Sequence, residues 1–144
     1  VFRAADAAIA ALKAKSVRAR RADFSEADAY PKRWFAAFVP EENRRAAKKQ
    51  CFSGRRHVGW LWQAFSMDFA PHQTGEEAES VREGIRGECR LYLPDEQVLL
   101  LLDEAPSADA LAGFGHYLLT DAEMRSTYVH PHRRDFGPYA AERA

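Results

Sequence analysis

The sequence lacks several features that would exclude or assign whole classes of protein at once. It holds only two cysteines, Cys51 and Cys89, and they form no C-x-x-C motif. Small secreted domains that depend on disulfides usually carry more cysteines, so we expect two free thiols and a cytoplasmic protein. No run approaches the roughly 18 to 20 apolar residues that span a bilayer, and Asp6 interrupts the alanine-rich start. We therefore expect neither a membrane protein nor a signal peptide.

Motifs that cradle nucleotides or activate a nucleophile are also missing. The chain contains neither G-x-G-x-x-G nor G-x-x-x-x-G-K-[ST], so a glycine loop for phosphate has no support. Neither Ser53 nor Ser66 lies in a G-x-S-x-G nucleophile elbow. Cys89 falls on the apolar side of an expected strand, which disfavours a thiol enzyme. We expect no cofactor and name no catalytic residue.

The residues that are present suit one domain with an uneven charge distribution. The chain has 144 residues, 47% of them hydrophobic, which is enough to bury a core. Residues 1–56 hold 14 Lys/Arg and 6 Asp/Glu, whereas residues 57–144 hold 7 and 15. We expect a single domain over 1–144, helical and basic over 1–56, sheet-containing and acidic over 57–144. The basic part indicates either solvated helix faces or a surface for an acidic partner.

Helical patterns dominate the first part of the chain. Apolar residues recur at helical spacing over residues 2–21, with basic residues gathered late, where they complement the helix dipole. A second helix has Ser25 as its expected cap and a bulky apolar face formed by three aromatic residues, Trp34, Phe35 and Phe38. A third helix begins at Pro40 and ends at Gly54.

Strand patterns dominate the second part. HVGWLWQAFS, residues 57–66, is rich in β-favouring residues and is expected to be the first strand. A helix follows, with Thr74 and Glu77 as its expected capping box and Gly87 at its end. ECRLYLP and the continuous apolar run VLLLLDE predict an antiparallel hairpin at the centre of the sheet.

MRSTYVH, residues 124–130, is expected to be the last strand, and residues 131–144 an extended tail. Residues 105–123 are expected to form a connection with a short helix capped by Ser107. Taken together, these patterns predict an α+β fold. It consists of a four-stranded, mostly antiparallel sheet packed by N-terminal helices and one inserted helix.

Two segments together are similar to a known family. WLWQAFS, followed by a loop and TGEEAESV, is one of them, and the other runs from Thr127, Val129 and His132 to the Gly-Pro-Tyr at 137–139. In this order they resemble domain of unknown function 4275, a family of small bacterial proteins, over about residues 57–140. Arg133 stands where the family usually has an acidic residue. The resemblance implies no catalytic chemistry. Small α+β proteins of this type are often encoded beside toxins as immunity proteins.

The segment STYVHPHRRDFGPY holds the candidate contact residues. His130 and His132 lie two apart, so an extended chain points them to the same side. With Asp135 and a fourth group from His57, His72 or His116, they could hold a metal ion. However, neighbouring arginines would repel a cation, so we expect no bound metal and a contact surface for an acidic partner instead. The residues assigned to that surface are His130, His132, Arg133, Arg134, Asp135 and Tyr139.

A second candidate surface is a basic stripe on the expected third helix. Its members, Arg44, Arg45, Lys48 and Lys49, share one helix face and would suit nucleic acid. Three functions therefore stay open. The first is a non-enzymatic protein-binding module, of the immunity-protein or antitoxin kind, that masks another protein. The alternatives are a His-centred hydrolase or metal enzyme and a nucleic-acid-binding module.

Overall fold

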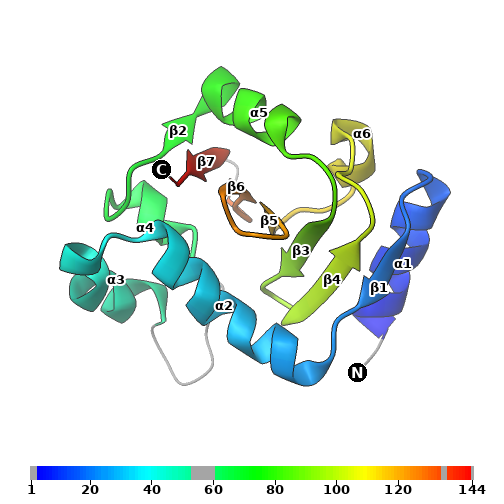
Figure 1. The fold of residues 1–144 in the computed structure, drawn as a ribbon, viewed down its shortest axis with the longest axis horizontal. Coiled ribbons are helices and arrows are strands. Elements are labelled where there is room, and N and C mark those ends of the chain that lie inside the picture. The colour runs from blue at the N-terminus through cyan, green and yellow to red at the C-terminus, as the bar shows by residue number, and fades with distance from the viewer. Residues whose placement is uncertain (1–2, 53–60, 134–135, 144) are drawn as a thin grey trace.

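The computed structural model of the 144-residue chain describes residues 3–52, 61–133 and 136–143. Within these residues the fold is α+β, as predicted, and holds six α-helices, one 3-10 helix and a single antiparallel sheet of seven strands (Figure 1). The elements in chain order are α1 (Arg3–Ala14), β1 (Ala19–Arg21), α2 (Phe24–Phe38), η1 (Glu41–Asn43), α3 (Arg44–Cys51), α4 (Gln63–Ser66), β2 (Gln73–Thr74), α5 (Gly75–Gly84), β3 (Cys89–Leu93), β4 (Val98–Leu102), α6 (Ala108–Leu111), β5 (Tyr117–Asp121), β6 (Ser126–His130) and β7 (Tyr139–Glu142).

The strands lie in the order β1-β4-β3-β5-β6-β7-β2, and every neighbouring pair is antiparallel. The predicted antiparallel hairpin is confirmed as β3 and β4, with Leu91 opposite Leu100. It does not lie at the centre of the sheet, because β4 is next to the edge strand β1 and β5 is the middle strand. Its turn is short, which is why the two strands pair directly. The sheet has two edges. One is β1, from the first part of the chain, and the other is the two-residue strand β2.

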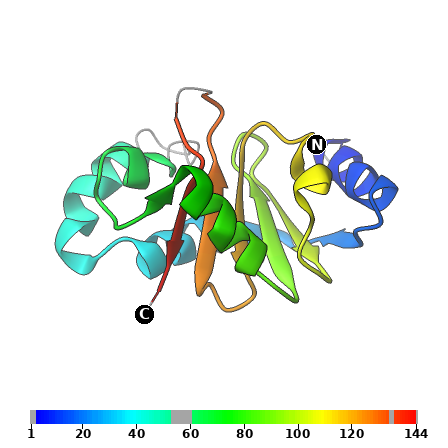
Figure 2. The ribbon, with the colours of Figure 1, turned by 90° about the horizontal axis from the view of Figure 1, so that it is seen from above.

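Helices cover both faces of the sheet (Figures 1 and 2). Helices α2, α3 and α4 pack on one face, here called the aromatic face, and α1, α5 and α6 pack on the other, here called the aliphatic face. Strand β4 shows why both cores exist. Leu99 and Leu101 point into the aromatic face, and Leu100 and Leu102 into the aliphatic face. A strand buried on both faces has no polar side to present, so its sequence is an uninterrupted apolar run.

Buried hydrogen bonds fasten α2 to the aromatic face. The indole Nε1 of Trp34 donates to Thr127 Oγ1 at 2.9 Å, and that hydroxyl donates to the carbonyl of Leu119 at 3.0 Å. One helical turn earlier, the Tyr30 hydroxyl lies 2.8 Å from Thr120 Oγ1. Residues four apart lie on one helix face, so α2 presents both polar atoms to β5 and β6 together. The first part of the chain is thereby joined to its last strands.

Aliphatic packing dominates the other face. Ala5, Ala8 and Leu12 of α1 are buried in the same cluster as Leu100 and Leu102, so the N-terminal helix packs on the body of the protein. Small alanines let the helix lie close to its neighbours. Helix α5 covers β6 and β7 at the other end of this face.

The predicted helix over residues 2–21 is too long, because the chain reverses at Ser16. Ser16 has a φ of 63°, and the amide of Val17 donates to the carbonyl of Leu12, as in a helix C-terminal turn. Residues after this turn form β1 instead of a last helical turn. Arg20 and Arg21 therefore lie on a strand at the sheet edge, and Arg18 lies just before it. Their charge complements no helix dipole.

The predicted strand over residues 57–66 is wrong wherever the structure describes it. Residues 57–60 lie outside the described residues. Trp62 is the N-cap of α4, and Ala64 and Phe65 inside it are buried. Short apolar runs fit a buried helix as well as a strand, and the aromatic residues of this run do not distinguish the two.

Other errors concern caps and strand number. Thr74 makes no side-chain capping bond, and α5 ends at Gly84 rather than Gly87. Ser107 does cap α6, through a 3.1 Å bond from the amide of Ala110, but Asp23 rather than Ser25 caps α2. The sheet has seven strands rather than the predicted four. The sequence did not predict β1, β2, β5 and β7, because each is short or lies in a segment that was expected to have another structure.

Candidate functional site

The end of β3, the start of β5 and the end of β6 lie on the same side of the molecule. They bring together residues that are far apart in the sequence. Tyr92 of β3 lies opposite Leu118 of β5, and Tyr117 of β5 lies opposite His130 of β6. Residues just after β3, just before β5 and just after β6 therefore meet. We call this place the sheet-end site. Its members are Trp62, Asp95, His116, His132, Arg133 and Phe136.

His116 lies at the centre of the sheet-end site. Its side chain is only 3% exposed, and its Nδ1 lies 3.1 Å from Asp95 Oδ1. Burial lowers the pKa of His116, and the neighbouring Asp95 carboxylate opposes that shift in part. The imidazole is therefore neutral at neutral pH. With the proton on Nδ1, donated to Asp95, the lone pair sits on Nε2.

The Nε2 atom of His116 is buried and makes no hydrogen bond among the described residues. A histidine whose other nitrogen is held by a carboxylate is the arrangement used by general bases and by metal ligands. The exposed ring of His132 lies beside it, with the two ring centroids 5.0 Å apart. Both line a pocket of about 470 Å³ between α1 and the turn that joins β3 to β4.

The pocket is lined by small, apolar and acid–base side chains. Its described lining consists of Ala4, Ala7, Ala8, Ala11, Leu93, Asp95, Glu96, Gly113, Phe114, Gly115, His116 and His132. No serine, threonine or cysteine is among these residues, so the histidines have no adjacent nucleophile in the part of the chain that is described. Burial raises the pKa of Glu96, and Asp95 adds to that effect.

His130 and His132 have different surroundings, because His130 is the last residue of β6 and His132 lies beyond it. Strand β6 ends at His130, so the alternation that would align the two side chains stops there. The His130 ring stacks on Tyr117 at 5.4 Å, and its Nδ1 lies 2.8 Å from the carbonyl of Gly115. Asp135, like His57, lies outside the described residues. Across the described ranges no three His, Cys, Asp or Glu side chains converge as a metal site would require.

Arg133 and Phe136 form the exposed part of the sheet-end site. The amide of Phe136 donates to the carbonyl of Arg133, and this turn places the guanidinium 5.7 Å from the Phe136 ring centroid. The same ring rests on buried Trp62, with centroids 5.2 Å apart, yet 38% of Phe136 stays exposed. Arg134, also assigned to this surface by the sequence, lies outside the described residues.

Tyr139, another assigned contact residue, is 7% exposed and packs in the core. Its ring contacts Phe65 and His72, with centroid distances of 6.0 and 5.4 Å. Gly137 allows this placement. It has a φ of +76°, and a Cβ there would lie 2.6 Å from Pro131 Cδ. The Gly-Pro-Tyr sequence thus seats Tyr139 against the sheet, and its ring is not available to a partner.

The basic stripe on α3 divides into a structural arginine and three exposed cations. The half-buried Arg44 donates from Nε to the carbonyl of Val39 at 3.0 Å and from a terminal nitrogen to that of Ala36 at 2.9 Å. These carbonyls lie at the C-terminal end of α2, where cations are favourable. Arg45, Lys48 and Lys49 are exposed.

The two cysteines are free and buried. Burial raises the pKa of Cys51 to about 12 and that of Cys89 to about 11. Both stay protonated at neutral pH, and only the thiolate is a strong nucleophile. Neither thiol is suited to catalysis.

A family model matches residues 7–140. The chain belongs to the family described as domain of unknown function (DUF4275). The resemblance found from residues 57–140 is thereby confirmed, and the match extends to α1, β1 and α2 as well. The family description supplies no activity. No match was found among curated proteins or solved structures. Among the described residues, no helix has both the length and the apolar character required to cross a bilayer.

Sequence reasoning missed three members of the sheet-end site: Trp62, Asp95 and Phe136. His116 was considered only as a remote fourth ligand. No local pattern joins these residues, since they come from four separate segments. An isolated histidine beside glycines, before a strand that was itself missed, gives no signal of its own.

Proposed function

We propose that this protein is a non-enzymatic protein-binding module that uses the exposed part of the sheet-end site. One observation carries the proposal: the half-exposed Phe136 ring, backed by the buried Trp62 and accompanied by the Arg133 guanidinium. Aromatic rings held rigidly from below, with arginine beside them, are typical of the few residues that dominate binding energy at protein interfaces. The partner surface that fits is apolar with carboxylates at its rim.

The finer form of the proposal is a protein of the immunity or antitoxin kind, which masks its partner by covering it. Two features support this form: the exposed side chains of the site and the lining of the pocket behind them. The exposed groups suit contact with another protein, and the pocket behind them has no nucleophile among its described lining residues. A masking protein needs only complementarity and affinity.

The test is a capture experiment followed by measurement on purified components. Tagged protein would be cross-linked in extracts of the source cells, and a stoichiometric partner would be identified and purified. Titration calorimetry should then show affinity that falls at least about tenfold, or about 1.4 kcal/mol, in Phe136→Ser and in Arg133→Glu.

The matched control is Phe24→Ser. Phe24 is 80% exposed at the start of α2, far from the sheet-end site in sequence. This variant should bind the partner as the unmodified protein does. Equal binding by all variants, or the absence of any stoichiometric partner, would contradict the proposal.

A second candidate is His-centred acid–base or metal chemistry, and one observation favours it: the unsatisfied Nε2 of His116 beside His132. Titration with Zn²⁺ or Ni²⁺ would distinguish the two functions. Stoichiometric binding that is lost in both His116→Gln and His132→Gln would favour this candidate. The protein-binding proposal instead expects no stoichiometric metal and a melting temperature indifferent to chelator.

A further inference from the structure

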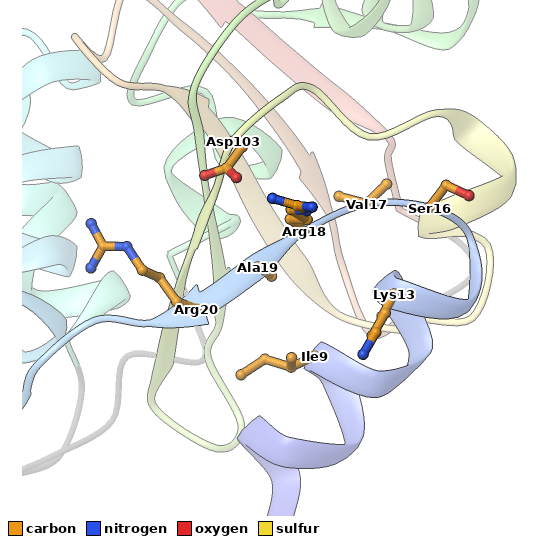
Figure 3. Close-up of a pocket in the computed structure, with 8 residues that line it drawn as sticks. All are labelled: Ile9, Lys13, Ser16, Val17, Arg18, Ala19, Arg20 and Asp103. Atoms are coloured by element: carbon orange, nitrogen blue, oxygen red, sulfur yellow. The ribbon is translucent and has the colours of Figure 1, made fainter.

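A groove of about 760 Å³ lies at the edge of the sheet that β1 forms. Figure 3 shows its two walls, with Ile9 and Lys13 on α1, Arg20 on β1 and Arg18 just before β1. Its other lining residues are Ser16, Val17, Ala19 and Asp103. The groove shares no lining residue with the sheet-end site.

No described strand pairs with the outward-facing backbone groups of Ala19 in β1. Strand β1 pairs with β4 on one side and is the terminal strand of the sheet, with no described strand beyond it. The carbonyl of Arg18 accepts from the amide of Asp103, and the amide of Ala22 donates to the carbonyl of Leu99. Backbone groups alternate sides along an antiparallel strand, so the N–H and C=O of Ala19, between these bonds, face away from β4.

Positive charge borders this open edge. Lys13, Arg18 and Arg20 are all exposed and line the groove, and Asp103 is the single carboxylate among the lining residues. Ile9 and Ala19, both half-buried, and the buried Val17 supply apolar surface between these charges. Unpaired backbone groups at a strand edge can bind the main chain of a peptide. The cations beside them can bind its acidic side chains, and the apolar surface can contact its apolar ones.

We infer that the groove binds an extended acidic segment of a partner protein, which adds to the sheet as a strand alongside β1. Backbone bonds to Ala19 set the register of the segment. Its carboxylates pair with Lys13, Arg18 and Arg20, and its alternate apolar side chains rest on Ile9. This inference does not rest on the proposed function of the sheet-end site.

Charge complementarity distinguishes this occupant from two others. A second copy of this chain, pairing β1 with β1, would place Arg18 and Arg20 against the same arginines of its partner, and like charges across strands are destabilising. Nucleic acid would gain from the cations. It would gain nothing from the open backbone edge or the apolar floor, and it would be repelled by Asp103.

The experiment uses the full chain and a fluorescent peptide of alternating glutamate and valine, with acetylated and amidated ends. Fluorescence anisotropy should show saturable binding that weakens as salt is added. Arg18→Glu combined with Arg20→Glu should weaken binding at least about tenfold. The matched control, Arg45→Glu combined with Lys48→Glu, makes the same charge change on α3 and should bind normally.

Backbone pairing has its own test. Ala19→Pro removes only the outward-facing N–H, because the ladder bonds to β4 belong to Arg18, Arg20 and Ala22, and proline is tolerated on edge strands. It should weaken binding although it changes no charge. Two peptides would be N-methylated at alternate residues, one at the odd positions and the other at the even positions. One of them should lose binding and the other should keep it.

Several results would overturn the inference. These are no saturable binding, equal binding of a lysine–valine peptide, or tighter binding of a single-stranded oligonucleotide that the double arginine variant abolishes. A dimer in peptide-free solution that Ala19→Pro dissociates would assign the edge to self-association instead. Phe136→Ser and Arg133→Glu should leave peptide affinity unchanged, so failure here is distinct from failure of the proposed function.

Discussion

Both faces of the sheet are buried, but they differ in the side chains that pack there and in the hydrogen bonds between them. The aromatic face buries Trp34, Phe65 and Tyr30, and its threonine hydroxyls bond to α2. The aliphatic face buries leucine and alanine under α1, α5 and α6. Its clearest side-chain bond, from the Tyr128 hydroxyl to the Glu79 carboxylate, lies near solvent. Apolar contact is non-directional, whereas hydrogen bonds fix one position. The difference indicates that hydrogen bonds help to fix the position of α2, whereas α1 is held mainly by apolar contact, with an exposed ion pair from Lys15 to Asp109 just beyond its end.

This contrast bears on where the molecule can bind. The groove at β1 lies between α1 and the sheet edge, on the side held by small aliphatic contacts. The sheet-end site rests partly on Trp62, which belongs to the aromatic core. The two proposed binding surfaces thus border different layers of the molecule.

The largest effect is expected in the core of the aliphatic face, at Leu100 of β4. Leu100 is fully buried in β4 between β1 and β3, so Leu100→Asp places a charge where no partner can reach it. An unpaired buried charge costs several kcal/mol against a stability of about 5 to 15 kcal/mol, so we expect no folded protein. Circular dichroism and solubility would show this, with Leu100→Met as the control. A soluble variant that melts cooperatively would contradict the assigned role of β4.

A smaller effect separates the two faces. Thr127→Val keeps the shape of the side chain but leaves the buried Trp34 N–H without an acceptor and the carbonyl of Leu119 without this donor. We expect a loss of about 1–3 kcal/mol in the free energy of unfolding. Tyr128→Phe on the aliphatic face should lose less, because the Glu79 carboxylate is 39% exposed and keeps its contact with Arg82. Equal losses in denaturant titrations would remove the distinction between the faces.

A pH-dependent effect should arise at the sheet end. Burial lowers the pKa of His116 in the folded state below the ordinary value of 6.5, while Asp95 opposes the shift and His132 and His130 add to it. The unfolded chain therefore binds a proton first, so stability is full above about pH 6.5 and declines as the pH falls toward the lowered folded value. His116→Asn keeps a donor for Asp95 but does not titrate. Its stability should fall less between about pH 7 and pH 5, and parallel curves for the two proteins would contradict this.

The parts of the fold that sequence reasoning predicted are those with a local cause. The hairpin of β3 and β4 follows from two apolar runs and a short turn, and the three N-terminal helices follow from periodicity. Strand β1 was missed because three residues with two arginines have no strand pattern. Its conformation comes from pairing with β4. Helix α4 was read as a strand because a run so short cannot reveal its period.

The candidate sites were less predictable, for the same physical reason. His132 and Arg133 were found because they form a conspicuous cluster in the sequence. The rings that contact His132 come from distant segments: the antiparallel register of β5 and β6 brings His116 near, and Trp62 comes from the start of α4. In the groove, Lys13, Arg18 and Arg20 are near in sequence but were assigned to a helix end. The reversal at Ser16 turns them into the border of an open strand edge.

The smallest effect is expected on α3, which belongs to the aromatic layer but exposes most of its charge. Lys48 and Lys49 make none of the side-chain hydrogen bonds seen at Arg44, so Lys48→Glu combined with Lys49→Glu should change the free energy of unfolding by no more than about 0.5 kcal/mol. Arg44→Ala should cost more, about 1.5–3 kcal/mol, because it leaves two carbonyls at the end of α2 without a charged donor.

The lysine variant also tests the nucleic-acid alternative on heparin and DNA. Retention lost in the lysine variant but kept in Arg18→Glu/Arg20→Glu would locate a polyanion surface on α3. Unchanged retention would remove the stripe as a binding surface and leave the groove at β1 as the basic feature to test.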